Sequence, residues 1–297
     1  PQAAAAMGWL APPAQRAGAI TFIFLGWSVA SVFGMPLHSF IGETFGWRWA
    51  FALVGVLAAG GAVWVWRVVP AGIRPPPLNL AAWREVFTRP ALLAVVAVTA
   101  LSGAGQFTLF TYMAPYYRQV LGASPLEVSL LFACFGGFGL LGNVLLSRHV
   151  DRIGAGRAVA VLLVTMAASL LAWPLATSVM LMALVLVPWG LGCFASNSAQ
   201  QARLGLAAPA LAPALMALNT SAIYAGQAVG AASGGAMVAA RSAALGPVPL
   251  GTAGSVSAEA SAQAAALYAP LPLVGLGFLA IALLTSLWAS RRLKGGA

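Results

Sequence analysis

The chain has 297 residues, of which 61% are hydrophobic and only 7% are charged, and it carries a net charge of +10. An average soluble domain has about 25% charged residues, so this composition excludes a soluble fold and predicts an all-α integral membrane protein with several spans. The charge does not indicate nucleic-acid binding, because the basic residues fall in short loops and form no continuous patch with interleaved aromatic residues.

Eight stretches of the chain are apolar over about 20 residues, the length that a helix needs to cross a bilayer. If the loop at residues 148–157 is placed in the cytoplasm, twelve of the fifteen basic residues fall on that side and three, Arg48, Arg118 and Arg241, on the other. This asymmetry follows the positive-inside rule and supports the count of eight spans. The predicted spans are residues 19–41, 47–66, 91–112, 126–147, 157–176, 178–200, 213–239 and 267–289.

The first predicted span carries small residues at regular spacing and one proline. Gly26, Gly34 and Gly42 belong to a stripe in which a second helix can approach closely. Pro36 lacks a backbone donor and should bend the helix. His38 has no acidic partner in its span, and we expect it to be a packing residue and not the proton carrier.

A proline-rich linker at residues 70–90 separates the first two spans from the last six. Asn79 is suited to cap a short helix in this linker, with Leu80, Trp83 and Phe87 on one face. We interpret this helix as lying on the cytoplasmic membrane surface. A disordered proline-rich tether fits the same composition.

The seventh span repeats the small-residue spacing at Gly226, Gly230 and Gly234, which indicates close helix packing. After it, residues 241–266 are polar, small and glycine-rich, and they are predicted to form a flexible loop outside the membrane.

Uncharged polar side chains inside the spans indicate a cavity. Such groups in hydrocarbon are usually turned toward protein or toward a water-filled space. For any one residue the alternative is a hydrogen bond between helices, but as a group they are expected to line one central cavity. The six residues are Gln106, Tyr112, Asn197, Asn219, Tyr224 and Gln227.

Residues 142–157 form the densest cluster of charge in the chain. Asp151 is suited to cap a helix and to accept paired hydrogen bonds from an arginine. The alternative is a basic loop that only sets the orientation in the membrane. The residues that we single out in this motif are Gly142, Asn143, Asp151, Arg152 and Arg157.

Several of these runs resemble the major facilitator superfamily, and within it the drug:proton antiporter group near the arabinose-efflux-type permeases. The resemblance is carried by NSAQQARL at residues 197–204 and by LNTSAIYAGQAVG at residues 218–230. The run GMPL at residues 34–37, with Gly42, is similar to the antiporter signature of the fifth helix, although Met35 here separates glycine from proline. Residues 142–157 look like the second-half copy of the cytoplasmic loop motif, with Asp151 and Arg152 at its core.

The resemblance implies a helical bundle with eight transmembrane helices in this chain. Residues 1–69 would be the end of the N-terminal half, comprising the tail of helix four and helices five and six. Residues 70–90 would be the cytoplasmic linker between the halves, and residues 91–297 the complete six-helix C-terminal half. Helices one to three and most of helix four would then be absent.

The function implied is export of a small organic solute or drug by alternating access, through proton-coupled antiport. We expect a multi-pass monomer in the cell inner membrane, with a small-molecule substrate, protons and the lipid bilayer as partners, and with a role in multidrug resistance. No nucleic acid and no cofactor is expected. The alternative is a non-transporting membrane scaffold or sensor with the same fold.

An enzyme is not expected, because the chain has no metalloprotease histidine pair, no nucleophile elbow and no phosphate-cradling loop. Its five acidic residues are scattered, and Cys134 and Cys193 lie inside apolar runs, so no metal site is predicted.

The resemblance also implies a role for Asp151. By the pseudo-symmetry of the two halves, its carboxylate should approach the start of the first span, at residues 16–19, with Arg152 and Arg157 close by. Such a contact would hold the cytoplasmic side closed. The alternative is that Asp151 caps the helix that follows it.

Overall fold

A computed structural model describes residues 7, 10–34, 37, 41, 45–69, 80–246 and 257–295, and all regular elements in these ranges are helical. Pro36, His38 and Gly42 lie outside the described residues, as does Asn79. The short turns are η1 (Pro13–Gln15), η2 (Ala30–Gly34), η3 (Trp173–Leu175) and η4 (Pro209–Leu211). The longer helices are α2 (Arg16–Val29), α4 (Trp47–Val68), α5 (Leu80–Thr88), α6 (Pro90–Phe110), α7 (Met113–Gln119), α8 (Pro125–Ile153), α9 (Ala155–Ala172), α10 (Val179–Ala207), α11 (Ala212–Leu245), α12 (Ala258–Tyr268) and α13 (Pro270–Gly295).

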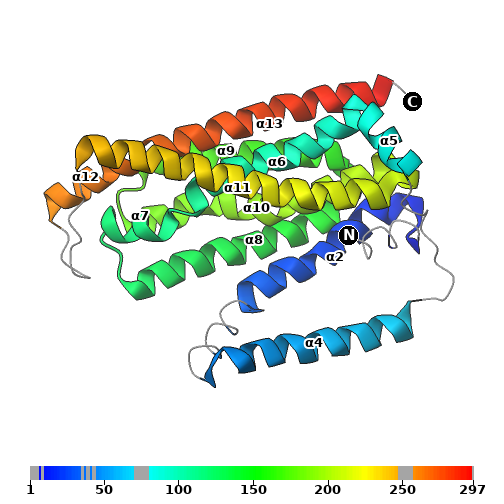
Figure 1. Ribbon diagram of the computed structural model, residues 1–297, viewed down its shortest axis with the longest axis horizontal. Helices are drawn as coiled ribbons and strands as arrows, with labels where there is room; N and C mark the ends of the chain where they lie inside the picture. Colours follow the sequence, from blue (N-terminus) through cyan, green and yellow to red (C-terminus); the bar gives the residue numbers. More distant parts are fainter. Residues whose placement is uncertain are drawn as a thin grey trace.

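The long helices from α6 to α13 run side by side in one bundle (Figure 1). Helix α6 packs between α11 and α13, while α10 packs between α8 and α9. Helix α2 lies against α8 and α10. The helix α5 and the last turns of α13 lie at one end of the bundle, whereas α7 and α12 lie at the other end. The end with α5 carries most of the basic residues, so we assign it to the cytoplasmic side.

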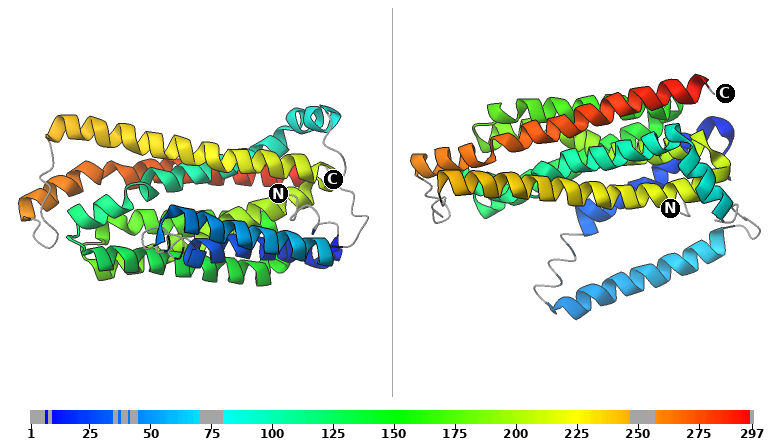
Figure 2. Two further views of the ribbon diagram at one scale, coloured as in Figure 1. Left: turned by 60° about the horizontal axis from the view of Figure 1, so that its bottom comes forward. Right: turned by 45° about the horizontal axis from the view of Figure 1, so that its top comes forward.

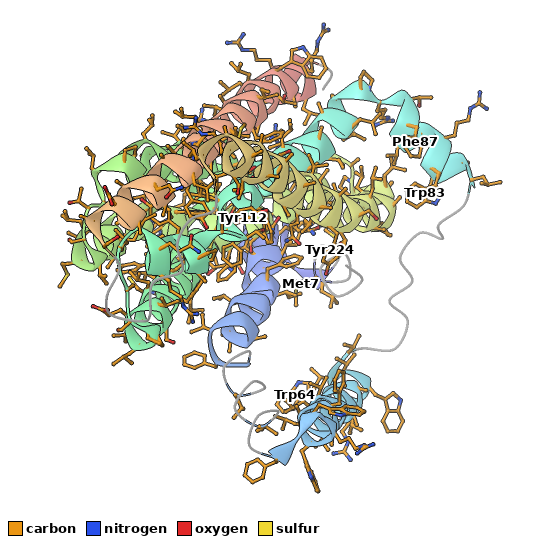
Figure 3. All side chains as sticks on the ribbon, turned by 60° about the vertical axis from the view of Figure 1, so that its left-hand side comes forward. Met7, Trp64, Trp83, Phe87, Tyr112 and Tyr224 are labelled. Carbon is orange, nitrogen blue, oxygen red and sulfur yellow. The ribbon has the colours of Figure 1, made fainter. Side chains whose placement is uncertain are left out.

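Helix α4 stands apart from the bundle, as Figure 1 and the right-hand view of Figure 2 show. Ala50 is its one buried residue, and Trp64 and Trp66 are 72% and 82% exposed. Figure 3 shows Trp64 on this separate helix. A helix that is apolar on all sides is stable in hydrocarbon because its backbone hydrogen bonds are made within the helix.

Six helices within the described residues are long and apolar enough to cross a membrane: Trp47–Val68, Pro90–Gln119, Pro125–Ile153, Ala155–Leu175, Val179–Ala207 and Ala258–Leu293. The predicted count of eight is therefore not confirmed. In the first predicted span the structure describes α2, which has 14 residues, and the five residues of η2 that follow it. The seventh corresponds to α11, which is long but rich in alanine, glycine, serine and amide residues that lower its mean hydropathy.

The predicted loop at residues 241–266 is partly helical. Helix α11 continues to Leu245, and α12 already begins at Ala258. Arg241 Nη2 donates to the carbonyl of Ala266 at 3.1 Å, and Gln263 Nε2 donates to that of Leu245 at 2.9 Å. These bonds join the end of α11 to α12. The segment was predicted to be a loop because it is polar and glycine-rich, but its many alanines favour a helix.

The linker contains the predicted short helix, α5. Its Val86 is buried against the bundle, and Trp83 stacks on Phe87 with ring centroids 6.2 Å apart. Leu80, Trp83 and Phe87 lie along one side of this helix, and that side is turned largely away from the bundle, since Trp83 is half-buried while Leu80 and Phe87 are 88% and 58% exposed. Figure 3 shows Trp83 and Phe87 at this end of the molecule. A position at the membrane surface stays a prediction.

Glycine sets the distance between α6 and α11. A β-carbon at Gly226 or Gly230 would collide with the carbonyl oxygen of Ala100 or Ala104, and one at Gly234 would lie 2.6 Å from that of Thr108. The backbones therefore touch over three turns, as the spacing predicted. In contrast, a β-carbon at Gly26 would meet no described atom within 4 Å.

We predict that Gly230→Ala lowers the thermal stability of the purified protein by about 1–3 kcal/mol, because the added methyl forces α6 and α11 apart. Gly277→Ala on α13 is the matched control, since its β-carbon would meet nothing within 4 Å. Thermal unfolding in detergent measures both. Equal unfolding temperatures for the two variants would contradict the packing described here.

Candidate functional site

A cavity of about 800 Å³ lies between α2, η2, α6, α8, α10 and α11. Phe24 of α2 and Val32 of η2 form the side that belongs to the first predicted span. The rest of the lining comes from α6, α8, α10 and α11. The cavity thus lies between the two parts of the chain that the linker separates in sequence, and its volume is in the range of small-molecule sites.

Phenylalanine provides most of the apolar lining. Phe110 is central to it, with ring centroids 5.2 Å from Phe107, 6.2 Å from Phe132 and 5.8 Å from Phe135. Aromatic rings contribute large apolar area in fixed orientations. The lining phenylalanines are Phe24, Phe107, Phe110, Phe132, Phe135 and Phe194.

The polar lining is uncharged, and none of the described residues that line the cavity carries a formal charge. Gln106 Nε2 donates to the hydroxyl and carbonyl of Ser102 at 3.2 and 3.3 Å, and Trp189 Nε1 donates to Gln106 Oε1 at 3.4 Å. These bonds fix the amide in one orientation. The polar lining residues are Thr99, Ser102, Gln106, Ser129, Asn197, Ser198 and Gln227.

Three of the six residues that we expected in the cavity line it, namely Gln106, Asn197 and Gln227. The sequence argument missed the phenylalanines. A phenylalanine in an apolar span has the same appearance in sequence whether it faces lipid or a cavity. The spacing of Phe107 with Phe110, and of Phe132 with Phe135, was the available signal.

The cavity lining does not include Tyr112, Asn219 or Tyr224, and this differs from the prediction. The Tyr112 hydroxyl donates to the carbonyl of Ala231 at 3.4 Å, so it makes a contact between helices. Tyr224 is 59% exposed, because one helical residue turns it about 100° away from the lining residue Ile223. Figure 3 labels both side chains, Tyr112 among the overlapping helices and Tyr224 on the side of α11 toward Met7.

Asn219 is fully buried behind the cavity wall, in a network that joins three helices. Thr99 Oγ1 donates to Asn219 Oδ1 at 2.6 Å, and Gln200 Nε2 donates to Thr99 Oγ1 at 3.1 Å and to the carbonyl of Val95 at 2.8 Å. This network connects α6, α10 and α11. Asn219 therefore makes a hydrogen bond between helices, which was the alternative to a place in the cavity lining.

Asp151 lies where the resemblance implied. Both carboxylate oxygens are 3.1 Å from the backbone nitrogen of Gly18, the third residue of α2. A β-carbon at Gly18 would lie 2.5 Å from Oδ2, so a larger residue there would displace the carboxylate from this position. The alternative that Asp151 caps α9 is not seen, since the first turn of α9 has no side-chain cap.

The basic residues of this motif do not join the contact. Arg152 and Arg157 are exposed, and neither forms an ion pair with Asp151 within the described residues. Gly142 and Asn143 are buried in α8, where a β-carbon on Gly142 would collide with the backbone of Leu191 in α10. Of the residues singled out in the first predicted span, Gly26 lies on α2 and Gly34 on η2, whereas Pro36 and Gly42 lie outside the described residues.

Comparison with known proteins adds the family. The sequence profile described as Major Facilitator Superfamily matches residues 1–231. The inner membrane transport protein YdhP of Escherichia coli K12 is 31% identical over 232 residues, covering 77% of this chain and 59% of the relative, and YdhP of Escherichia coli O157:H7 is 30% identical over the same shares. The chain thus spans about 59% of the length of these curated relatives.

Among solved structures, the fold is similar to that of a bacterial homologue of the human lysosomal transporter Spinster, crystallised inward-facing and unoccupied. The TM-score is 0.52 with 18% identity, covering 97% of this chain and 74% of that one. Apolar helices, the fold and the profile match lead to one conclusion: this multi-pass membrane protein belongs to the Major Facilitator Superfamily.

Proposed function

We propose that the protein exports a small organic solute by alternating access, as a monomer in the inner membrane. The observation that carries the proposal is the cavity of about 800 Å³, which combines phenylalanine rings with fixed amide and hydroxyl groups. Apolar walls with a few convergent polar groups are typical of small-molecule sites. The similarity to YdhP, which is named as a transport protein, supports the same activity.

The proposed organisation is two halves with the cavity between them. Residues 1–69 belong to the N-terminal half, residues 70–90 link the halves, and residues 91–297 form the C-terminal half. The cavity supports this division because Phe24 and Val32 come from the first part and the remaining lining from the last. Superfamily transporters move such halves against each other around a central site.

Asp151 is proposed to act as a latch between these halves on the cytoplasmic side. Its carboxylate accepts from Gly18 N in the first turn of α2, where the helix dipole favours negative charge. The contact exists only while α8 and α2 are together, so it biases the two-state equilibrium toward the closed state.

Proton-coupled antiport is supported by the similarity of residues 34–37 to the antiporter signature. It receives no support from the cavity, because no carboxylate is among the described lining residues. A non-transporting scaffold or sensor is not favoured, since such a protein has no need of a polar-lined space between its halves.

We predict that Gln106→Ala and Asn197→Ala each lower the initial rate of transport about fivefold, because a lost hydrogen bond is worth about 1 kcal/mol. Full-length protein in proteoliposomes, tested with a sugar, a nucleoside and a lipophilic dye, provides the rate. Tyr224→Ala is the control, since Tyr224 lies outside the cavity lining. Undiminished rates in both variants, or an equal loss with Tyr224→Ala, would contradict the assignment of the site.

Asp151→Asn should slow transport by roughly 5–150-fold while substrate affinity stays within twofold or so, because the contact changes the conformational balance by about 1–3 kcal/mol. Gly18→Ala should have the same effect, since its methyl group displaces the carboxylate. Arg152→Gln is the exposed control. The latch is wrong if Asp151→Asn transports at the wild-type rate or if the loss is entirely in affinity.

His38→Ala is predicted to keep the pH dependence of transport, because the histidine has no acidic partner in its span. Transport measured at several pH values in proteoliposomes tests this. A variant that still transports but no longer responds to pH would identify His38 as the coupling group after all.

A further inference from the structure

Arg203, near the end of α10, is a buried cation that has no acidic partner among the described residues. The residue is only 5% exposed. Nη1 donates to Ser286 Oγ at 2.9 Å, and Nη2 donates to the Ser286 carbonyl at 3.0 Å and to Ser290 Oγ at 2.9 Å. All of these acceptors are uncharged. Burying a charge without an opposite charge is costly, so this arrangement calls for an anion.

The guanidinium still has hydrogen-bond capacity. Arginine has five N–H donors, and the bonds to Ser286 and Ser290 use three of them. The N–H on Nε and the second one on Nη1 make no hydrogen bond with the described residues. These two donors point to different sides of the guanidinium, so each can reach a separate acceptor, and the Nε–H can donate to a single phosphate oxygen.

The start of α9 lies against the same guanidinium. A β-carbon at Gly156, in the first turn of α9, would lie 3.6 Å from Arg203 Nε and 3.4 Å from Ser290 Oγ. This turn has no acidic residue and no side-chain cap, and its third residue is Arg157. A helix start carries about half a positive charge, so it is an unfavourable neighbour for two arginines unless an anion binds beside it.

The surface around Arg203 is basic at the cytoplasmic ends of the helices and apolar farther along α9 and α13. Arg291 and Arg292 directly follow Ser290 and are exposed, and Arg292 Cζ lies 5.7 Å from the centroid of Trp288. Exposed Leu284 and Leu287 continue along α13, as do Val161 and Val164 along α9. Basic groups above a lipid-facing apolar strip match a phospholipid headgroup above its acyl chains.

We propose that the cytoplasmic ends of α9, α10 and α13 bind one anionic phospholipid of the adjoining leaflet. The phosphate lies on the exposed side of the first turn of α9, with Arg157 and Arg291 around it and Arg203 beneath it, and the acyl chains lie along α9 and α13. The lipid supplies the negative charge that the described protein lacks at this point. The site is separate from the cavity and does not depend on the transport function.

Native mass spectrometry of the full-length protein in detergent, with phosphatidylglycerol or phosphatidylcholine added, tests the site. Wild type should retain phosphatidylglycerol in preference. Arg157→Gln should lower this retention about fivefold, and Arg203→Gln at least as much. Arg118→Gln is the matched control, because Arg118 is an exposed arginine at the opposite end of the bundle. If Arg203→Gln does not fold, the test rests on Arg157→Gln, because Arg157 is exposed and its replacement leaves the fold intact.

The proposal is overturned if wild type retains the two lipids equally, or if Arg157→Gln retains phosphatidylglycerol as wild type does. Inorganic phosphate provides the remaining comparison. It should raise the unfolding temperature less than phosphatidylglycerol at the same concentration. An equal rise would mean that the site takes a free anion and not a lipid.

Discussion

Close backbone contact at glycine is the constraint on which the cavity depends. Lipid tails are as apolar as the helices, so association in a bilayer relies on packing and not on hydrophobic burial. At Gly103 of α6, a β-carbon would lie 3.4 Å from the carbonyl of Ile223 and 3.5 Å from Gln227 N, both on α11. This approach brings Ile223 and Gln227 into the same wall as Gln106. On the other side, a β-carbon at Gly139 of α8 would lie 2.5 Å from the ring of Phe194, so glycine also sets where that ring stands.

Behind this wall, polar contacts fix helices that packing alone would leave free to slide. Gln200 bonds to Thr99, and Thr99 bonds to Asn219, so that one residue each from α10, α6 and α11 is held in register. Hydrogen bonds of this kind average about 0.6 kcal/mol in membrane proteins, which is small. Their contribution is to specify one relative position of α6, α10 and α11, which apolar packing alone does not fix. They thereby hold the residues of the cavity lining in place.

Composition and periodicity predicted the helical membrane class, the helix in the linker and the small-residue contact of α11. The position of Asp151 followed from the repeat of a motif between two halves. The direction of individual side chains was less accessible, since neighbouring residues such as Ile223 and Tyr224 point about 100° apart and only packing decides which of them faces inward. Polarity correctly indicated that Gln106 faces the cavity. The same criterion wrongly placed Asn219 there, although its hydrogen-bond partner is a residue on another helix.

Under the proposed function, the cavity opens alternately to the two sides of the membrane. The most direct test of this places one cysteine in the wall, as Ala133→Cys in a protein with Cys134→Ala and Cys193→Ala, because Ala133 is an exposed lining residue. Labelling with a membrane-impermeant maleimide is compared in right-side-out and inside-out vesicles. The account predicts reaction from both sides, and slower reaction when a transported solute is present. Reaction from one side only, unchanged by solute, would contradict it.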